Sequence, residues 1–167
     1  MTTPARRRRR LLVPAAALLA GGVLLTASCA SSPPADIGLV DGRLRSCPDT
    51  PNCVASENTD AGHRVPPFRY EGPAEPAWQR LSATVRASGG RIERETGGYL
   101  WATFRSLIFR FVDDVEFRHD PAARVIHVRS AARLGHSDFG VNRRRVERLR
   151  RAWRAASRLP GPTKLQW

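Results

Sequence analysis

Residues 108–134, IFRFVDDVEFRHDPAARVIHVRSAARL, decide the fold of this chain. Apolar and polar residues alternate over 108–118 and again over 124–134, and this period of two is typical of half-buried β-strands. Between them, Asp120 at the first position and Pro121 at the second position favour a type I turn. The segment is therefore predicted to form a β-hairpin.

A hairpin centred on this turn has a defined register. On one face it pairs apolar residues: Phe117 with Ile126, Val115 with Val128, Phe111 with Ala132 and Phe109 with Leu134. On the other face it pairs charged residues: Glu116 with His127 and Asp114 with Arg129. Asp113 and Ser130 also fall on the apolar face, where a carboxylate must be hydrogen-bonded or neutralised. A slip by one residue would mix the two sets, so the pattern specifies the register.

The flanking sequence adds two strands and two helices. The expected elements are, in order, a helix at 75–88, strands at 91–96, 99–105, 108–118 and 124–134, and a helix at about 141–158. Trp78, Leu81 and Val85 recur at helical spacing in the first of these. The sequence thus predicts the α+β class, with the order α-β-β-β-β-α: a four-stranded antiparallel meander with two helices packed on one face.

The N-terminus has the composition of an export signal. Five arginines, Arg6–Arg10, precede the apolar run 11–25 and the small residues 26–28. Because Cys29 follows, the segment resembles a bacterial lipoprotein signal, and the resemblance implies lipid attachment at Cys29. An uncleaved membrane anchor and a simple secreted protein are the alternatives. We expect a lipid-anchored protein of the cell envelope, on the extracytoplasmic side of a membrane.

Three segments follow the expected signal peptide, residues 1–28. Residues 29–36 are expected to form a flexible tether, residues 37–160 a single domain, and residues 161–167 a C-terminal tail. Without residues 1–28 the chain has 23 Lys and Arg against 15 Asp and Glu, a net charge of +8. This charge favours anionic partners, such as lipid head groups or an envelope polymer, and export argues against nucleic acid.

Two cysteines remain besides Cys29. Cys47 and Cys53 bracket a turn-rich segment, and an even pair in an oxidising compartment favours a structural disulfide. The alternatives are a metal site that uses His63 and a redox pair, but the spacing matches neither zinc-ligand nor Cys-x-x-Cys patterns. We expect a disulfide-closed coil before the first helix, and no metal or cofactor.

Three sequence strings resemble a known family. They are Cys47-Pro48-x-x-Pro51-Asn52-Cys53-Val54, the strand sequence Phe109–Phe117, and Arg129–Arg143, RSAARLGHSDFGVNR. The match runs from Cys47 to about Trp153 and is to the domain of unknown function DUF1499, found in bacterial envelope proteins and in plastids. The resemblance implies a small α+β domain and supplies no reaction, substrate or cofactor. At Ala131-Ala132 the chain departs from the family, where a serine is expected.

Polar residues of the hairpin and of the following loop form a candidate site. The cluster consists of Asp113, Asp114, Glu116, Arg129, Ser130, Arg133, Asp138, Asn142 and Arg143. One interpretation is a hydrolase-like enzyme whose acid and base groups come from Asp113, Asp114, Glu116, His136 and Asp138. Cross-strand ion pairing explains the carboxylates without catalysis, and residues adjacent in sequence rarely converge as a triad. No catalytic residue is therefore assigned.

The expected last helix favours a binding function. Its apolar stripe is Val146, Leu149, Trp153 and Ala156, and its other side carries Arg144, Arg148, Arg151 and Arg158. Such arginines form either a solvated face or a surface for anionic head groups. Arg129, Arg133 and Asn142, around the loop 135–140, are a second candidate for an anion site. We therefore expect a non-enzymatic binding or structural module for an anionic envelope component.

Overall fold

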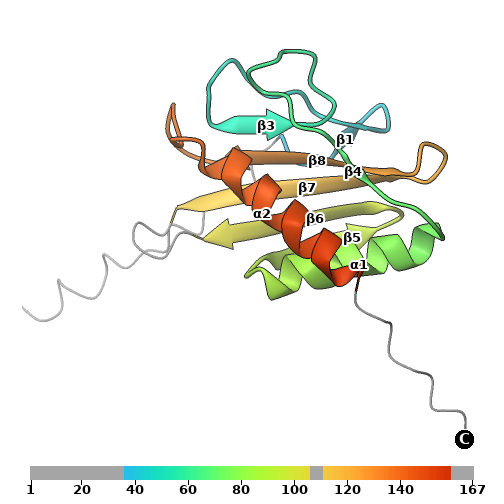
Figure 1. Cartoon of the computed structure of the whole chain (residues 1–167). Coiled ribbons are helices and arrows are strands. Elements are labelled where there is room, and N and C mark those ends of the chain that lie inside the picture. Colours follow the sequence, from blue (N-terminus) through green and yellow to red (C-terminus); the bar gives the residue numbers. More distant parts are fainter. Residues whose placement is uncertain (1–35, 106–110, 159–167) are drawn as a thin grey trace, which may run out of the picture. The chain divides into compact units, whose positions relative to one another are not determined.

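The computed structural model describes residues 36–105 and 111–158, which belong to one compact unit (Figure 1). Its elements are β1 (Leu39–Val40), β2 (Arg43–Leu44), β3 (Cys53–Ala55), β4 (Phe68–Arg69), α1 (Ala74–Ala87), β5 (Arg91–Thr96), β6 (Tyr99–Arg105), β7 (Val112–Asp120), β8 (Val125–Ala132) and α2 (Val141–Ala156). The expected signal peptide, Cys29, the tether up to residue 35, Phe109 and the tail 161–167 lie outside the described residues.

Strands β5 to β8 form the expected antiparallel meander, but the sheet is wider than four strands. The strand order is β3-β8-β7-β6-β5, and β4 also pairs with β8. The prediction was wrong in the number of strands because β3 and β4 come from the segment expected to be coil. These strands have three and two residues, too few for a period of two to be recognised.

The register of β7 and β8 differs from the predicted one by two residues. Val115 pairs with Ser130 rather than Val128, and Phe117 pairs with Val128. The connection is longer than the predicted type I turn, because residues 121–124 all lie between the paired strands. The last of them, Arg124, has a φ of 52°. A shift of two residues leaves every side chain on its original face. Within the paired residues of β7 and β8 the predicted faces are therefore correct, and the predicted pairs are wrong.

The shift also changes the charged pairs. Glu116 lies opposite Arg129 rather than His127, and Asp114 lies opposite Ala131 rather than Arg129. Asp113 lies opposite Ala132 rather than Ser130. Phe111 and Leu134, which were expected on the apolar face, are 54% and 70% exposed.

Both helices contribute to one hydrophobic core with the same face of the sheet (Figure 1). The core includes Trp78, Leu81 and Val85 of α1, Val146, Leu149 and Trp153 of α2, and Leu100, Phe117 and Val128 of the sheet. Ala156, expected in the apolar stripe of the last helix, is exposed. Burial of large apolar side chains contributes roughly 1.5–3 kcal/mol each, so this face dominates the apolar stabilisation.

Two glycines allow the chain to turn from α1 into β5. Gly89 has a φ of +85°, the left-handed conformation that ends many helices. A Cβ atom on Gly90 would lie 2.6 Å from Cζ of Phe104, so the backbone approaches the core closely at this point.

The opposite face of the sheet is polar and is partly covered by the β1–β2 hairpin. Leu44 of β2 packs with Tyr99 and Trp101 of β6, and Ile37 joins this smaller cluster. The backbone N–H of Gly38 donates to a carboxylate oxygen of Glu116 at 2.8 Å. The N-terminal part of the domain therefore shields charged groups of the sheet from solvent.

The expected disulfide between Cys47 and Cys53 is present, with the two Cα atoms 5.6 Å apart. Cys53 is the first residue of β3, so the bridge fastens the preceding loop to the sheet. In the described part of the chain, neither helix combines the length and the apolar character needed to cross a membrane.

Candidate functional site

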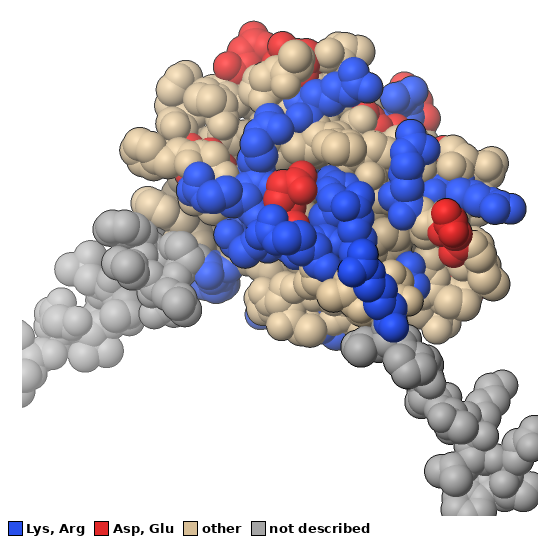
Figure 2. Space-filling model, viewed as in Figure 1, with Lys and Arg blue, Asp and Glu red and all other residues tan. Residues whose placement is uncertain are grey.

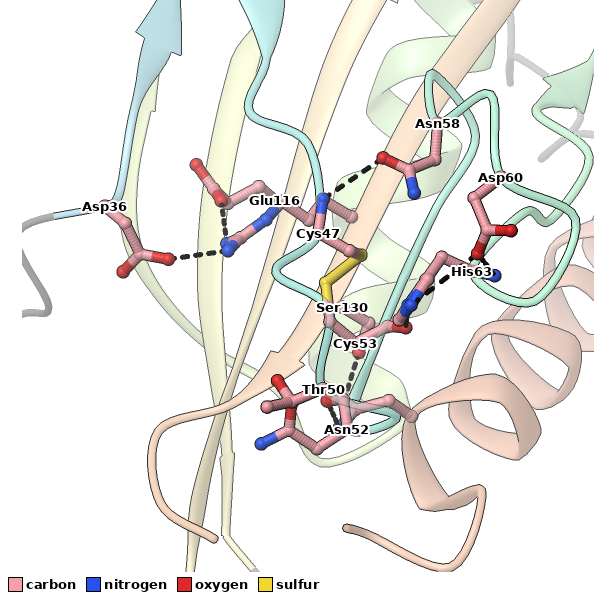
Figure 3. Close-up of a disulfide and its surroundings, with 12 residues drawn as sticks. Asp36, Cys47, Thr50, Asn52, Cys53, Asn58, Asp60, His63, Glu116 and Ser130 are labelled. Atoms are coloured by element: carbon pink, nitrogen blue, oxygen red, sulfur yellow. Dashed lines mark hydrogen bonds and ion pairs between the residues drawn. A yellow bond between two sulfur atoms is a disulfide. The ribbon is translucent and has the colours of Figure 1, made fainter. Parts of the chain in front are cut away.

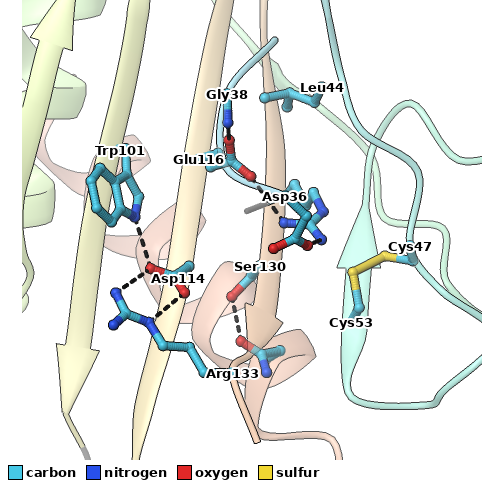
Figure 4. A network of polar contacts seen from close by, with 12 residues as sticks. Asp36, Gly38, Leu44, Cys47, Cys53, Trp101, Asp114, Glu116, Ser130 and Arg133 are labelled. Atoms are coloured by element: carbon cyan, nitrogen blue, oxygen red, sulfur yellow. Dashed lines mark hydrogen bonds and ion pairs between the residues drawn. A yellow bond between two sulfur atoms is a disulfide. The ribbon is translucent and has the colours of Figure 1, made fainter. Parts of the chain in front are cut away.

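The structure divides the predicted polar cluster between the two faces of the sheet. Asp113, Ser130, Asp138 and Asn142 are linked on the side of the helices. Asp114, Glu116 and Arg133 lie on the other side (Figure 4), where Arg129 bonds Glu116. Because successive residues of a strand point to opposite faces, Asp113 and Asp114 do not share one site.

Asp113 of β7 is buried against Arg145 of α2. Nη2 of Arg145 donates to Asp113, and Nη1 donates to Oδ1 of Asn142 at 2.5 Å. The hydroxyl of Ser130 donates to the same Asn142 oxygen at 2.5 Å. Burial raises the pKa of Asp113, although the charge and hydrogen bond of Arg145 oppose this shift. This group holds α2 against the sheet.

Asp138 organises the start of α2. Its Oδ1 accepts the N–H of Gly140 at 2.8 Å, and its Oδ2 accepts the N–H of Asn142 at 2.7 Å. The positive end of the helix dipole also stabilises a carboxylate at this position. The side-chain amide of Asn142 bonds Oδ2 of Asp138 at 2.8 Å and the carbonyl of Asn52 at 3.0 Å. Asp138 thus positions α2 beside the disulfide loop.

On the other face, Asp114 is bound by Arg133 and Trp101. Nε and Nη2 of Arg133 donate to its two oxygens at 2.7 and 2.8 Å, and Nε1 of Trp101 donates at 2.8 Å. Asp114 is 2% exposed, so this bidentate pair is shielded from water. The hydrogen bond to Asp114 raises the pKa of Arg133.

Glu116 is fully buried and bonded to three groups. Besides the N–H of Gly38, the hydroxyl of Tyr99 donates to it at 2.6 Å and Nη1 of Arg129 at 3.0 Å. Burial and the hydrogen bond to Glu116 raise the pKa of Tyr99. Nη2 of Arg129 donates to Oδ2 of Asp36 at 2.6 Å. Arg129 is therefore held between two carboxylates.

Glu57 lies at the side of the same polar face. Nη2 of Arg118 donates to it at 3.0 Å, Nε of Arg43 lies 3.3 Å away, and the N–H of Leu44 donates at 2.9 Å. Burial alone would raise the pKa of Glu57, but the hydrogen bonds of Arg118 and Leu44 outweigh it and lower that pKa. Nearby, burial lowers the pKa of His127.

Arg143 belongs to neither group. Its guanidinium donates to the carbonyl oxygens of Arg64 at 2.9 Å and of Gly62 at 2.6 Å. It ties α2 to the loop that follows β3, so its role in the structure is to position that loop.

The residues expected for a hydrolase do not converge in the structure. Asp138 caps α2 on the helix side, Asp114 and Glu116 lie on the opposite face, and His136 is exposed in the loop. Asp113, Asp114 and Glu116 each accept hydrogen bonds from an arginine. Within residues 36–105 and 111–158, no group of three or more His, Cys, Asp or Glu side chains is placed to hold a metal ion.

A hollow of about 690 Å³ lies beside the disulfide. Its lining includes Asp36, Arg43, Arg45, Glu57 and Arg129, together with the apolar residues Val40, Leu44 and Pro48. Figure 3 shows Asp36, Glu116 and the Cys47–Cys53 bridge in this region. Its volume lies in the range typical of small-molecule sites.

Basic side chains gather over α2 (Figure 2). The exposed members, named the α2 arginine stripe from here on, are Arg144, Arg148, Arg151, Arg154 and Arg158. Arg144 donates to the carbonyl of Phe139 at 2.7 Å. Within the described ranges, the rest of the stripe forms no ion pair. The acidic residue of α2, Glu147, pairs instead with the buried Arg150 at 3.4 Å.

Sequence reasoning missed five residues of these groups: Asp36, Glu57, Tyr99, Trp101 and Arg145. A strand at 99–105 places Tyr99 and Trp101 on one face, and a buried Trp N–H requires an acceptor, so this signal could have found both residues. Arg145 lies three residues after Asn142 on the same helix face. Asp36 is 93 residues from Arg129 in sequence, and no local pattern joins them.

These features define a small α+β domain, fastened by a disulfide, whose buried carboxylates are neutralised by arginines. The family model described as "Protein of unknown function (DUF1499)" matches residues 43–153, and the chain belongs to this family, as the sequence resemblance indicated. The match covers both cysteines of the disulfide, the sheet and most of α2. No curated protein matches the chain.

Proposed function

We propose that this protein is a lipid-anchored, non-catalytic module of the cell envelope that binds an anionic membrane surface through the α2 arginine stripe. The proposed anchor is Cys29, at the end of the segment that resembles a lipoprotein signal. The observation that carries the proposal is the exposure of the stripe without acidic partners among the described residues.

The contrast between the two sides of α2 supports this surface. The inward arginines have structural partners: Arg145 binds Asp113, and Arg150 donates to the carbonyls of Pro66 and Pro67 at 2.6 and 2.8 Å. The outward arginines repeat at spacings of three and four residues, at which like charges repel along a helix. An anionic surface removes this repulsion, and each arginine close to it contributes about 1 kcal/mol.

The proposed anchor would keep the stripe near the membrane. Seven peptide units separate Cys29 from Asp36, so this tether spans at most roughly 25 Å. Electrostatic attraction to lipid head groups falls off within a Debye length of about 8 Å at physiological salt. A short tether therefore favours repeated contact of the stripe with the surface.

The test compares binding of the full-length protein to phosphatidylcholine vesicles and to vesicles of two parts phosphatidylcholine and one part phosphatidylglycerol. A lipid anchor binds both, so the preference for the anionic vesicles reports the stripe. We expect the triple variant Arg148→Gln, Arg151→Gln and Arg154→Gln to lose roughly ten- to hundredfold of this preference. The matched control, Arg69→Gln with Arg91→Gln and Arg105→Gln, removes the same charge from exposed arginines elsewhere and should retain most of it.

An equal loss in both triple variants would mean that only net charge matters, which contradicts the stripe. Mass spectrometry of the N-terminal peptide tests the anchor separately. We expect a diacylglyceryl group on Cys29, and an intact segment 1–28 would contradict it while leaving the comparison of variants valid.

A further inference from the structure

We propose that the hollow beside the disulfide binds a small amphiphilic oxyanion, a phosphate monoester or a carboxylate that carries a short apolar group. In the free protein, Asp36 occupies the position of the oxyanion. This site lies on the polar face of the sheet, with the side chains of Arg129 and Glu116, whereas α2 packs on the other face. It is therefore independent of the α2 arginine stripe.

Arg129 supplies the cation at the base of the site. The residue is 2% exposed and lines the hollow. Its Nη1 donates to Glu116, but its Nε is buried and has no hydrogen-bond partner. Nη2 and Nε form one edge of the guanidinium, whose spacing matches two oxygens of a carboxylate or phosphate. Asp36 engages this edge at Nη2 alone, so one donor is left for a better-placed oxyanion.

Asp36 has the properties of a replaceable occupant. Its side chain is 51% exposed, whereas that of its partner Arg129 is 3% exposed. Because half of its side chain is already exposed, the Asp36 carboxylate loses little hydration in the pair, and it is readily replaced by another anion. Glu116 keeps the buried charge of Arg129 neutralised when Asp36 leaves. An incoming oxyanion then restores the charge that Asp36 had supplied.

The remaining lining suits a ligand with a charged and an apolar part. Arg45 is exposed at the hollow and forms no ion pair within the described chain. Glu57, the other acid of the lining, is already held by Arg118 at 3.0 Å. Val40, Leu44 and Pro48 provide apolar contact. A volume of about 690 Å³ accommodates an anionic head with a chain of several carbons.

The test measures binding of hexyl phosphate and of hexanoate, both soluble as monomers, by calorimetry on the full-length protein in a fixed concentration of uncharged detergent. We expect saturable binding of at least one, and the tighter of the two identifies the head group. Hexanol, inorganic phosphate and acetate, which each lack one part of the ligand, should bind at least roughly fivefold more weakly.

Three single variants assign the site. Asp36→Ala removes the competing carboxylate and should tighten binding roughly two- to fivefold, whereas Arg45→Gln should weaken it by a similar factor. Arg105→Gln makes the same change of charge at an exposed arginine that does not line the hollow, and it should leave binding unchanged. All three positions are half-exposed or exposed, and circular dichroism checks that each variant is folded.

Unchanged or weaker binding in Asp36→Ala would overturn the role of Asp36. Equally tight binding of hexanol would overturn the oxyanion position, and an equal affinity for inorganic phosphate would overturn the apolar part. Binding of neither hexyl compound would overturn the site as a whole, and it would leave the vesicle comparison unaffected.

Discussion

Arginine neutralises the buried carboxylates of this domain. The pairs are Asp113 with Arg145, Asp114 with Arg133, Glu116 with Arg129 and Glu57 with Arg118. The planar guanidinium presents five donors, which suits a carboxylate that must be satisfied away from water. Removal of one member leaves an uncompensated buried charge and costs about 3–5 kcal/mol. Each pair therefore acts as a unit in stability.

At the residue scale we predict that Asp114 is coupled energetically to Arg133. Asp114→Asn should lower the free energy of unfolding by about 3 kcal/mol, because it removes the charge from a bidentate ion pair whose side chains are only 10% and 2% exposed. A double-mutant cycle with Arg133→Gln, measured by urea unfolding, should give a coupling energy of about 1–3 kcal/mol.

The control cycle combines Asp114→Asn with Arg129→Gln, the pair that the register expected from sequence would join. Arg129 bonds Glu116 and Asp36 instead, so its coupling to Asp114 should be smaller than that of Arg133. A larger coupling to Arg129 than to Arg133 would contradict the observed side-chain pairing.

At the scale of elements, the disulfide loop holds the edge strand β3 against the sheet. This strand is too short to be stable through its backbone hydrogen bonds alone. Strand β3 has three residues and pairs with β8 through Cys53 and Ala131. The carbonyl of Asn52 also accepts the N–H of Ala132 at 3.0 Å. The Cys47–Cys53 bridge restricts the loop in the unfolded chain and so favours this pairing on folding.

We predict that the double variant Cys47→Ala and Cys53→Ala lowers the free energy of unfolding by about 2 kcal/mol, the loop-closure value for a short ring. Urea unfolding measures the change. Wild-type protein with a reduced disulfide is the control, since it loses the bond and keeps both sulfur atoms, and it should show a similar loss. No change in either sample would mean that the backbone contacts of Asn52 alone hold β3 in place.

At the scale of the whole molecule, the two faces of the sheet bury different chemistry. The helix face encloses the large apolar core, and the other face encloses ion pairs beneath the β1–β2 hairpin. Two histidines near these faces, His119 and His127, are partly buried, and this burial changes their pKa values. His119 stacks on Trp78, with ring centroids 5.2 Å apart, and bonds the hydroxyl of Tyr70 at 2.8 Å. Burial lowers the pKa of His119, and it lowers the pKa of His127 in the same way.

We predict that the stability of the domain falls with acidification near neutral pH. Because the pKa of each of these histidines is lower in the folded chain than in the unfolded chain, the unfolded chain binds protons more strongly. The free energy of unfolding should be highest above the ordinary histidine pKa of about 6.5 and should fall as the pH drops below it. Urea unfolding at a series of pH values measures this slope.

The variant His119→Phe keeps an aromatic ring against Trp78 and removes one titrating group, so its slope should be shallower than that of the wild type. Replacement of the exposed His136 by Gln is the control and should leave the slope unchanged. An unchanged slope in His119→Phe would contradict the assignment of the pH dependence to this half-buried ring.

The sequence by itself determined the four strands of the meander, the two helices and the face to which most of their side chains point. Alternation placed Phe117 and Val128 toward the core and Glu116 and Arg129 away from it, and helical spacing identified Trp78 as a core residue. The disulfide followed from the even number of cysteines besides Cys29 and from the oxidising compartment that the N-terminal segment predicts. These features depend on residues that are close together in the sequence. A shift of the strand register by two residues leaves each side chain on the same face.

Only the tertiary structure decided the register, the width of the sheet and the partners of the buried charges. The register depends on the left-handed conformation of Arg124, which composition does not reveal. Arg145 reaches Asp113 over 32 residues, and Asp36 reaches Arg129 over 93. Such contacts form only when the packing of the helices and of the β1–β2 hairpin excludes water, and this burial is what makes each charge require its partner.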